Sequence, residues 1–138
     1  MILVTGGAGY IGSHTVAALE DAGQAPIIFD DFSSGHRDFV GSTPMVEGDI
    51  RRIDDIRPVF SEFPIEAVIH SAGQALAGES RTCTDRYYDT NVRGGLNLLN
   101  AMQEAGVQFL IFSSTCATYG IAETSLLEIR VFVFLPVS

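Results

Sequence analysis

The sequence predicts an α/β fold, a doubly wound parallel sheet of about five strands with helices on both faces. Short apolar runs alternate along the chain with segments whose apolar residues recur at helical spacing. Three glycines, Gly6, Gly9 and Gly12, join the first apolar run to the first helical segment. An acidic residue, Asp30, ends the second run about 18 residues later. With right-handed crossovers, these observations predict a Rossmann-type sheet of strand order 3-2-1-4-5.

The composition bounds the class of protein. The chain has 138 residues, 46% of them hydrophobic, enough for one folded domain. The net charge of −9 disfavours nucleic acid and anionic membranes as partners. The two cysteines form no CxxC pair, the histidines show no metal spacing, and no apolar run approaches the ~20 residues of a membrane span. We therefore expect a soluble, cytoplasmic protein with reduced thiols and no catalytic metal.

The glycine turn predicts an anion site. A strand begins at Ile2, and the first helix is expected from Tyr10 to Ala22. Gly6 can take positive φ to reverse the chain, Gly9 leaves room for a ligand, and Gly12 lets the helix pack against the strand. The free amides and positive end of that helix favour a pyrophosphate. Periodicity predicts that the helix packs on the sheet through Ile11, Thr15, Ala18, Leu19 and Ala22.

Ala25–Asp30 is predicted to be the second strand. Two roles suit Asp30 at its end: accepting both hydroxyls of an adenosine ribose, or capping a turn. The ribose role favours NAD over NADP, because a 2′-phosphate would meet a negative charge. Arg37 could weaken that preference or lie in solvent.

A polar loop leads to a short third strand, Met45–Glu47, and then to a second helix. Proline is best tolerated in the first turn of a helix, so Pro58 predicts a start near Asp54 or Asp55, either of which could cap it. The apolar face of this helix is expected to comprise Ile53, Ile56, Phe60 and Phe63.

Ile65–His70 is predicted to be the fourth strand, and the small residues after it leave room for a ligand. The longest helix is expected from Tyr87 to Ala105. Asn91 on this helix either reaches an adjacent strand end or stays exposed. Gly94 and Gly95 each cost the helix ~1 kcal/mol relative to alanine, which indicates close packing. The predicted core face comprises Tyr88, Val92, Leu96, Leu99 and Met102.

Val107–Phe112 is predicted to be the fifth strand, followed by the hydroxyl cluster 113–115. In a parallel sheet of this kind, ligands bind at the carboxyl ends of the strands. The expected ligand-facing segments are the glycine turn, Asp30, Asp49–Ile50, Ser71–Gly73 and Ser113–Thr115.

Several motifs together resemble the UDP-glucose 4-epimerase family of the extended short-chain dehydrogenase/reductase superfamily. They are Thr5–His14, Asp30–Asp31, Gly48–Ile50, Val68–His70, Ala77–Ser80, Tyr87–Val92 and Phe112–Gly120. The resemblance covers about residues 1 to 120, roughly the first third of a full-length member.

The resemblance implies NAD as cofactor. It implies that Gly6, Gly9, Tyr10, Ile11 and Gly12 hold the pyrophosphate, Asp30 and Asp31 the adenosine end, Asp49 and Ile50 the adenine, Ala72 and Gly73 the middle of NAD, and Asn91 the nicotinamide side. It also places Ser34, Gly35 and Ser113 among the cofactor-binding residues. Thr115 matches the catalytic Ser/Thr that bonds the sugar hydroxyl being oxidised.

The family reaction interconverts UDP-glucose and UDP-galactose through a 4-keto sugar, with a tyrosinate as base and a lysine four residues after it. This sequence has four tyrosines and no lysine, and Ala75 stands where the family often carries another lysine. The region that binds the UDP-sugar is also missing. We therefore expect a cofactor-binding part that is inactive alone. Alternatives are a non-catalytic dinucleotide-binding or dimerising module, or part of a related nucleotide-sugar dehydratase or reductase.

Residues 121–138 do not look like the family's continuation, so we divide the chain into a domain at 1–120 and an atypical hydrophobic tail at 121–138. The tail fits a frameshifted or prematurely ended reading frame. Arg130–Leu135 has strong β propensity. We expect this segment to cover the edge of the fifth strand, or the chain to form a homodimer or self-associate through that edge or the long helix.

Overall fold

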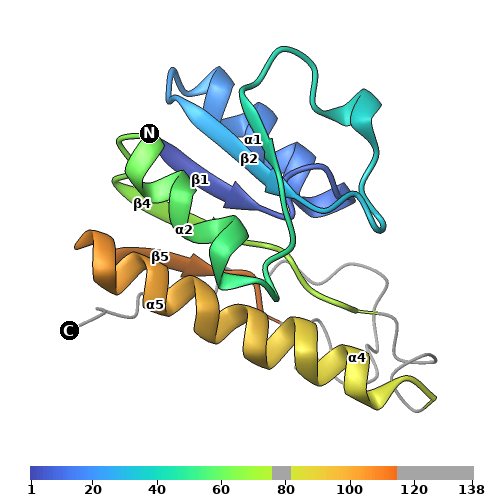
Figure 1. Ribbon diagram of the computed structural model, residues 1–138. Coiled ribbons are helices and arrows are strands. Elements are labelled where there is room, and N and C mark those ends of the chain that lie inside the picture. Colours follow the sequence, from blue (N-terminus) through green and yellow to red (C-terminus); the bar gives the residue numbers. More distant parts are fainter. Residues whose placement is uncertain (76–81, 115–138) are drawn as a thin grey trace, which may run out of the picture.

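The computed structural model describes residues 1–75 and 82–114 and contains one parallel sheet (Figure 1). The sheet has five strands in the order β3-β2-β1-β4-β5. The strands are β1 (Ile2–Thr5), β2 (Pro26–Asp30), β3 (Met45–Glu47), β4 (Ala67–His70) and β5 (Phe109–Phe112). The predicted fold class and strand order are confirmed, although β2, β4 and β5 begin one or two residues later than expected.

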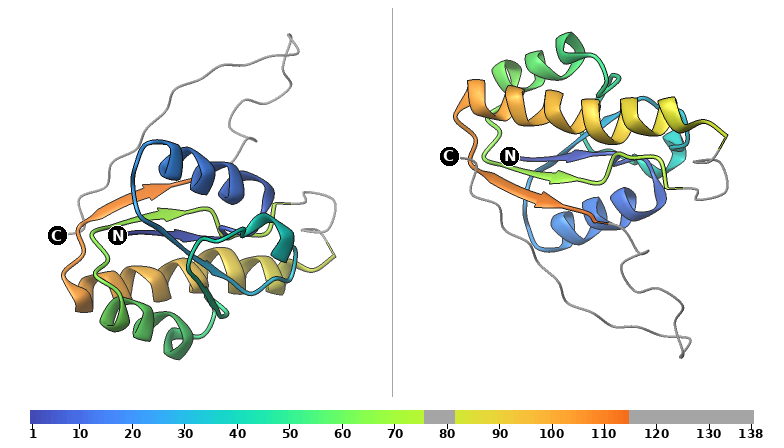
Figure 2. Two further views of the ribbon diagram at one scale, coloured as in Figure 1. Left: turned by 90° about the horizontal axis from the view of Figure 1, so that it is seen from above. Right: turned by 90° about the horizontal axis from the view of Figure 1, so that it is seen from below.

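Helices cover both faces of the sheet (Figure 2). The helices are α1 (Tyr10–Asp21), the 3-10 turn η1 (Arg37–Phe39), α2 (Ile53–Glu62), α4 (Thr84–Tyr88), the π-helical segment η2 (Asp89–Gly94) and α5 (Gly95–Ala105). α1 lies on one face, while α2 and α5 lie side by side on the other. The connections therefore bring the carboxyl ends of all five strands to one edge.

Each face of the sheet has its own apolar core. Leu3 and Val68 face the cluster that also contains Leu98 and Met102 of α5. Val4 and Ile28 face the smaller cluster with Val16 of α1. Because neighbouring strand residues point to opposite faces and both faces are covered, each strand is a continuous apolar run rather than an alternating one.

The predicted packing face of α1 is wrong. Gly12 and Val16 are the buried residues of α1, whereas Ile11 is 60% exposed and Ala18 and Ala22 are exposed. A Cβ on Gly12 would lie 2.0 Å from the Gly6 carbonyl oxygen, so the helix touches the β1 turn at Gly12. This contact sets the orientation of the helix and turns Ile11 toward solvent.

The predicted start of α2 is also wrong. α2 begins at Ile53, so Pro58 lies inside the helix and not in its first turn. Pro58 and Asp54 are both exposed, so water can satisfy the Asp54 carbonyl that Pro58 cannot bond. The Asp55 carboxylate accepts a hydrogen bond from the Asp49 N–H at 3.1 Å instead of capping the helix. The predicted apolar face is confirmed, with Ile56 fully buried.

The long helix starts at Thr84, and its predicted core face is wrong at three positions. Tyr88, Val92 and Leu96 are 67%, 50% and 56% exposed, whereas Leu98, Ala101 and Met102 are buried. The buried residues before them are Thr90 and Gly94 of η2. A Cβ on Gly94 would lie 2.7 Å from the Ile50 side chain, so this glycine makes the close contact, and Leu96 is turned away from the core. Nothing lies within 4 Å of a Cβ on Gly95.

Candidate functional site

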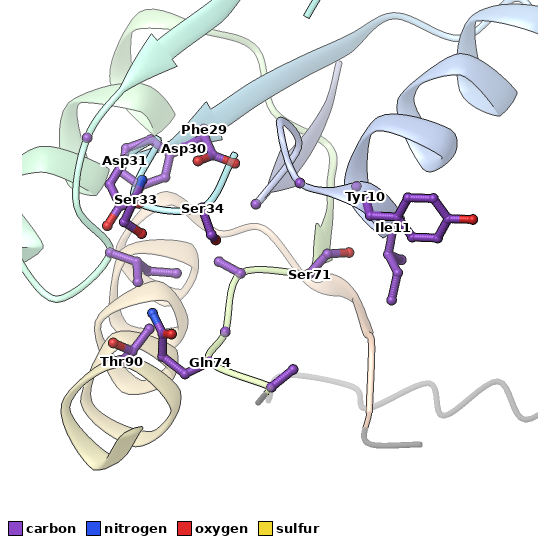
Figure 3. A pocket seen from close by; sticks show the side chains of 18 residues that line it. Tyr10, Ile11, Phe29, Asp30, Asp31, Ser33, Ser34, Ser71, Gln74 and Thr90 are labelled. Atoms are coloured by element: carbon purple, nitrogen blue, oxygen red, sulfur yellow. Dashed lines mark hydrogen bonds between the residues drawn. The ribbon is translucent and has the colours of Figure 1, made fainter. Parts of the chain in front are cut away.

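A cleft of about 290 Å³ opens at the carboxyl ends of β2, β1 and β4, beside the first turn of α1. Figure 3 shows Asp30, Asp31, Ser33 and Ser34 gathered at the β2 end, with Ser71 and Gln74 on the loop that leaves β4. Tyr10 and Ile11 of α1 form the third side. This is the place where a doubly wound sheet binds its ligand.

The glycine turn has the geometry that the spacing predicts. Gly6 has φ +70°, and a Cβ there would lie 2.6 Å from the Ala72 nitrogen. Gly12 packs on the Gly6 carbonyl, as described above. At Gly9 a Cβ would meet the Gly6 oxygen at 3.3 Å and no other atom closely. Gly6 and Gly12 are therefore required by the fold, whereas Gly9 keeps the floor of the cleft open.

The first turn of α1 is free to bind an anion. α1 has Gly9 at its N-cap, no side-chain cap and no acidic residue in its first turn. None of the 18 described residues that line the cleft is an arginine or a histidine. A phosphate group in this cleft would therefore be held by main-chain amides and the helix dipole.

Asp30 is buried at the end of β2 and supports the turn beside it. Its Oδ2 accepts a hydrogen bond from the Ala8 N–H and its Oδ1 one from the Phe32 N–H, each at 2.9 Å. Gly35 packs directly on this carboxylate, because a Cβ there would lie 2.9 Å from Oδ1. Turn capping is thus confirmed. Each carboxylate oxygen retains a lone pair, which leaves capacity for the ribose role that stays a prediction.

Arg37 closes the loop after β2 from outside. Its guanidinium lies 4.1 Å from the centre of the Phe32 ring and bonds the Glu47 carboxylate of β3. Phe32 has a φ of +55°, in the left-handed region that non-glycine residues rarely adopt. Arg37 is not among the cleft residues, so it holds the loop rather than facing a ligand.

Asn91 fixes the loop that leaves β4. Its Oδ1 accepts from the Gln74 N–H at 2.8 Å, and its Nδ2 donates to the Gln74 carbonyl at 3.0 Å. The prediction that this amide reaches an adjacent strand end is therefore confirmed. The side chain supports the cleft from behind, and its contact with a nicotinamide remains a prediction.

His70 is buried behind the cleft at the end of β4. Its Nδ1 lies 2.6 Å from Thr5 Oγ1, across the β1–β4 pair. Burial lowers the pKa of the His70 imidazole to about 4, so the ring is neutral near pH 7. His70 therefore ties two central strands together.

Most of the predicted site residues meet at the cleft. Those that line it are Gly6, Gly9, Tyr10, Ile11, Gly12, Asp30, Asp31, Ser34, Ile50, Ala72 and Gly73. Four predicted residues do not line it: Gly35, Asp49, Asn91 and Ser113. Thr115 and the tail 121–138 lie outside the described residues.

Asp49 and Ser113 each have another role. The Asp49 carboxylate bonds Arg51 through both oxygens, and this pairing lowers the pKa of the carboxyl. The Ser113 N–H donates to the His70 carbonyl at 2.9 Å, which continues the β4–β5 pairing.

Sequence reasoning missed several lining residues: Phe29, Ser33, Gly48, Gln74 and Thr90. Four of them are next to predicted positions and could have been found by extending each strand end by one residue. Thr90 lies on η2, and nothing in the sequence pattern brings that segment to the cleft.

Two other searches bear on the class of site. Within residues 1–75 and 82–114, no group of three His, Cys, Asp or Glu side chains is placed to hold a metal ion. No helix among those residues is long and apolar enough to cross a membrane.

The strand order, the glycine turn and the acidic end of β2 define a Rossmann-type domain of the kind that binds dinucleotides. A family model described as the NAD dependent epimerase/dehydratase family matches residues 2–130. The chain therefore belongs to that family.

Curated relatives and solved structures agree with this assignment. The chain is 46% identical over 123 residues to a UDP-glucose 4-epimerase of Rhizobium leguminosarum bv. trifolii, covering 89% of this chain and 38% of that protein. The UDP-glucose 4-epimerase of Brucella ovis in complex with NAD superimposes with a TM-score of 0.82 at 42% identity, covering 90% of this chain and 38% of that one. The Thermus thermophilus UDP-glucose 4-epimerase complex with NAD gives a TM-score of 0.84 at 35% identity, covering 98% and 44%. The chain thus spans about 38% of the length of the curated relatives it matches best.

Proposed function

We propose that this chain is the NAD-binding part of a UDP-glucose 4-epimerase and that it does not turn over substrate by itself. The observation that carries the proposal is the cleft in which uncapped amides of α1 face an open glycine floor beside two carboxylates at the end of β2. The relatives solved with NAD share this fold at more than a third sequence identity.

The residues present fit NAD. The N–H groups of the first turn of α1 would hold the diphosphate, and Gly9 leaves the space that its approach needs. Asp30 and Asp31 would accept hydrogen bonds from the adenosine ribose. The other half of the dinucleotide would lie along the Ser71–Gly73 loop. Bound NAD supplies a hydride acceptor for oxidation of a sugar hydroxyl.

The charges around the adenosine end favour NAD over NADP. A 2′-phosphate there would lie against the Asp30 and Asp31 carboxylates. The nearby guanidinium of Arg37 is already bonded to Glu47. We therefore propose that the preference for NAD resides in these two carboxylates.

Catalysis needs residues that this chain lacks. A phenol with a pKa near 10 becomes a base near neutral pH only when a positive charge lowers that pKa. None of the four tyrosines has a lysine nearby, because the sequence contains no lysine. Epimerisation, the UDP-sugar site and its specificity would therefore require a longer chain. A dehydratase or reductase would use the same cofactor cleft, and the family description covers both reaction types.

A second candidate function is a dimerising module. The long helix carries an exposed apolar stripe, Tyr88, Val92 and Leu96. This stripe runs into a mostly apolar hollow of about 340 Å³ between α5 and β5, which also includes Phe112. Large apolar surfaces of this kind mark protein–protein contacts.

Calorimetric titration of the purified chain with NAD tests the first proposal. We expect binding by the unmodified chain and at least tenfold weaker binding by Gly9→Ala, because the added methyl group enters the phosphate approach while the backbone at Gly9 (φ −79°, ψ 174°) suits any residue. Gly95→Ala is the matched control, since a Cβ there meets nothing. Absence of NAD binding by the folded, unmodified chain would contradict the proposal.

A further inference from the structure

Ser71 is the first residue after β4, and its hydroxyl has no partner. Its Oγ is buried, and among the described residues it is the buried side-chain oxygen or nitrogen for which no hydrogen bond exists. Buried polar groups are nearly always paired, and an unpaired one calls for a specific explanation. A hydroxyl donor needs an acceptor that the protein itself does not provide here.

The backbone around Ser71 is held firmly. Its N–H donates to the Thr5 carbonyl at 3.0 Å. A Cβ on Gly6 would lie 2.8 Å from the Ser71 carbonyl carbon, so the glycine turn and this loop are in contact. Further along, Asn91 grips Gln74 through two hydrogen bonds. The hydroxyl can therefore find a partner by rotation about χ1, without movement of the chain.

The position of Ser71 indicates where that partner lies. Ser71 lines the cleft, and Figure 3 shows its side chain directed toward the first turn of α1, near Ile11. Asp30 and Asp31 mark the adenosine end at β2, and the strand order β2-β1-β4 puts Ser71 beyond the glycine turn from them. A dinucleotide laid across these strands would bring its diphosphate, or the ribose beyond it, next to Ser71.

We propose that Ser71 is a positioning residue for the dinucleotide, whose hydroxyl donates a hydrogen bond to an acceptor oxygen of the diphosphate or of the ribose beyond it. The inference rests on the proposed function and adds a contact on the side of the cleft away from adenosine. In the free protein the hydroxyl is unpaired, and the bound ligand provides its acceptor.

This role has a signature that a structural serine would not show. Ser71→Ala removes an unpaired buried hydroxyl, so the ligand-free protein should melt a few degrees higher than the unmodified chain. The same substitution should weaken NAD binding by about three- to tenfold, the usual range for one hydrogen bond. A serine that supports the fold would instead lower the melting temperature when replaced.

The experiment combines melting curves with calorimetric titrations of NAD, ADP-ribose and AMP. Ser71→Ala should weaken NAD and ADP-ribose but leave AMP unchanged, because AMP ends before Ser71. Ser71→Cys keeps the size with a weak donor and should behave like Ser71→Ala. Ser42→Ala, an exposed serine before β3, is the control and should change neither quantity.

The outcomes separate the two proposals. If the unmodified chain binds no NAD, the proposed function fails and the role of Ser71 with it. If the chain binds NAD and Ser71→Ala binds equally well, the Ser71 inference alone is overturned. A lower melting temperature of ligand-free Ser71→Ala, or equal weakening of AMP, would also overturn it.

Discussion

Gly12 and Gly95 both lie in helices, but a methyl group would meet very different surroundings at the two positions. At Gly12 a Cβ would lie 2.0 Å from a main-chain oxygen, whereas at Gly95 no atom lies within 4 Å. The main chain of Gly6 cannot yield, because Gly6 is itself packed on Ala72. Gly12 is therefore a requirement of the fold, and Gly95 is not.

We expect Gly12→Ala to lower the free energy of unfolding by at least about 3 kcal/mol, because the added methyl overpacks a rigid contact. Gly95→Ala should raise it by up to ~1 kcal/mol through helix propensity. Urea unfolding followed by circular dichroism measures both. Equal stabilities of the two variants would contradict the close contact at Gly12.

His70 makes stability depend on pH. Its folded pKa of about 4 lies below the unfolded value of 6.5, so the unfolded chain binds more protons between these values. Stability from this residue is complete above pH 6.5 and is lost as the pH falls toward 4. We expect a loss of about 2 kcal/mol between pH 7.5 and pH 5 from His70 alone.

Urea unfolding at the two pH values measures this loss. His70→Asn should be less stable at pH 7.5 but should show a pH dependence smaller by that amount. His36→Asn, which removes an exposed histidine, should keep the pH dependence of the unmodified chain. An unchanged slope in His70→Asn would show that another group is responsible.

At the scale of elements, both errors in helix orientation have one physical cause. α1 and the long helix touch the core most closely through Gly12 and Gly94. Hydrophobic periodicity gives a glycine no weight, so it centred each face on larger side chains nearby. Where no glycine makes the close contact, as in α2, the predicted face of Ile53, Ile56, Phe60 and Phe63 is confirmed.

The two faces of α5 should respond differently to truncation. Leu98 is fully buried, so Leu98→Ala should cost about 2–5 kcal/mol of unfolding free energy. Leu96 is mostly exposed, and Leu96→Ala should cost no more than about 0.5 kcal/mol. Thermal unfolding of the two variants checks the orientation of the helix. The periodicity-based orientation predicts the opposite order.

At the scale of the whole molecule, the cofactor cleft is complete while the groups for chemistry are not. All elements that line the cleft belong to residues 1–75 and 82–114. We expect the purified chain to bind NAD but to form no UDP-glucose from UDP-galactose in a coupled assay. Measurable turnover above a no-protein blank would contradict the inactivity we propose.

The stripe of Tyr88, Val92 and Leu96 gives the molecule a further testable property. We expect self-association that increases with concentration in sedimentation velocity, because an apolar face of this size is better buried than hydrated. Leu96→Glu should make the chain monomeric. Ala17→Glu, on an exposed position of α1 across the sheet, should not. A chain that remains monomeric at all concentrations would contradict the dimerising role.

The sequence by itself determined the fold class, the strand order and most of the cleft. Strand ends such as Asp30 and the glycine turn are local signals, because spacing along the chain decides which backbone conformations are possible. Tertiary structure alone decided which way α1 and α5 face, that Pro58 is tolerated inside α2, that Thr90 reaches the cleft and that the Ser71 hydroxyl has no partner. Each of these depends on which atoms from distant segments meet, and such contacts leave no periodic trace along a single chain.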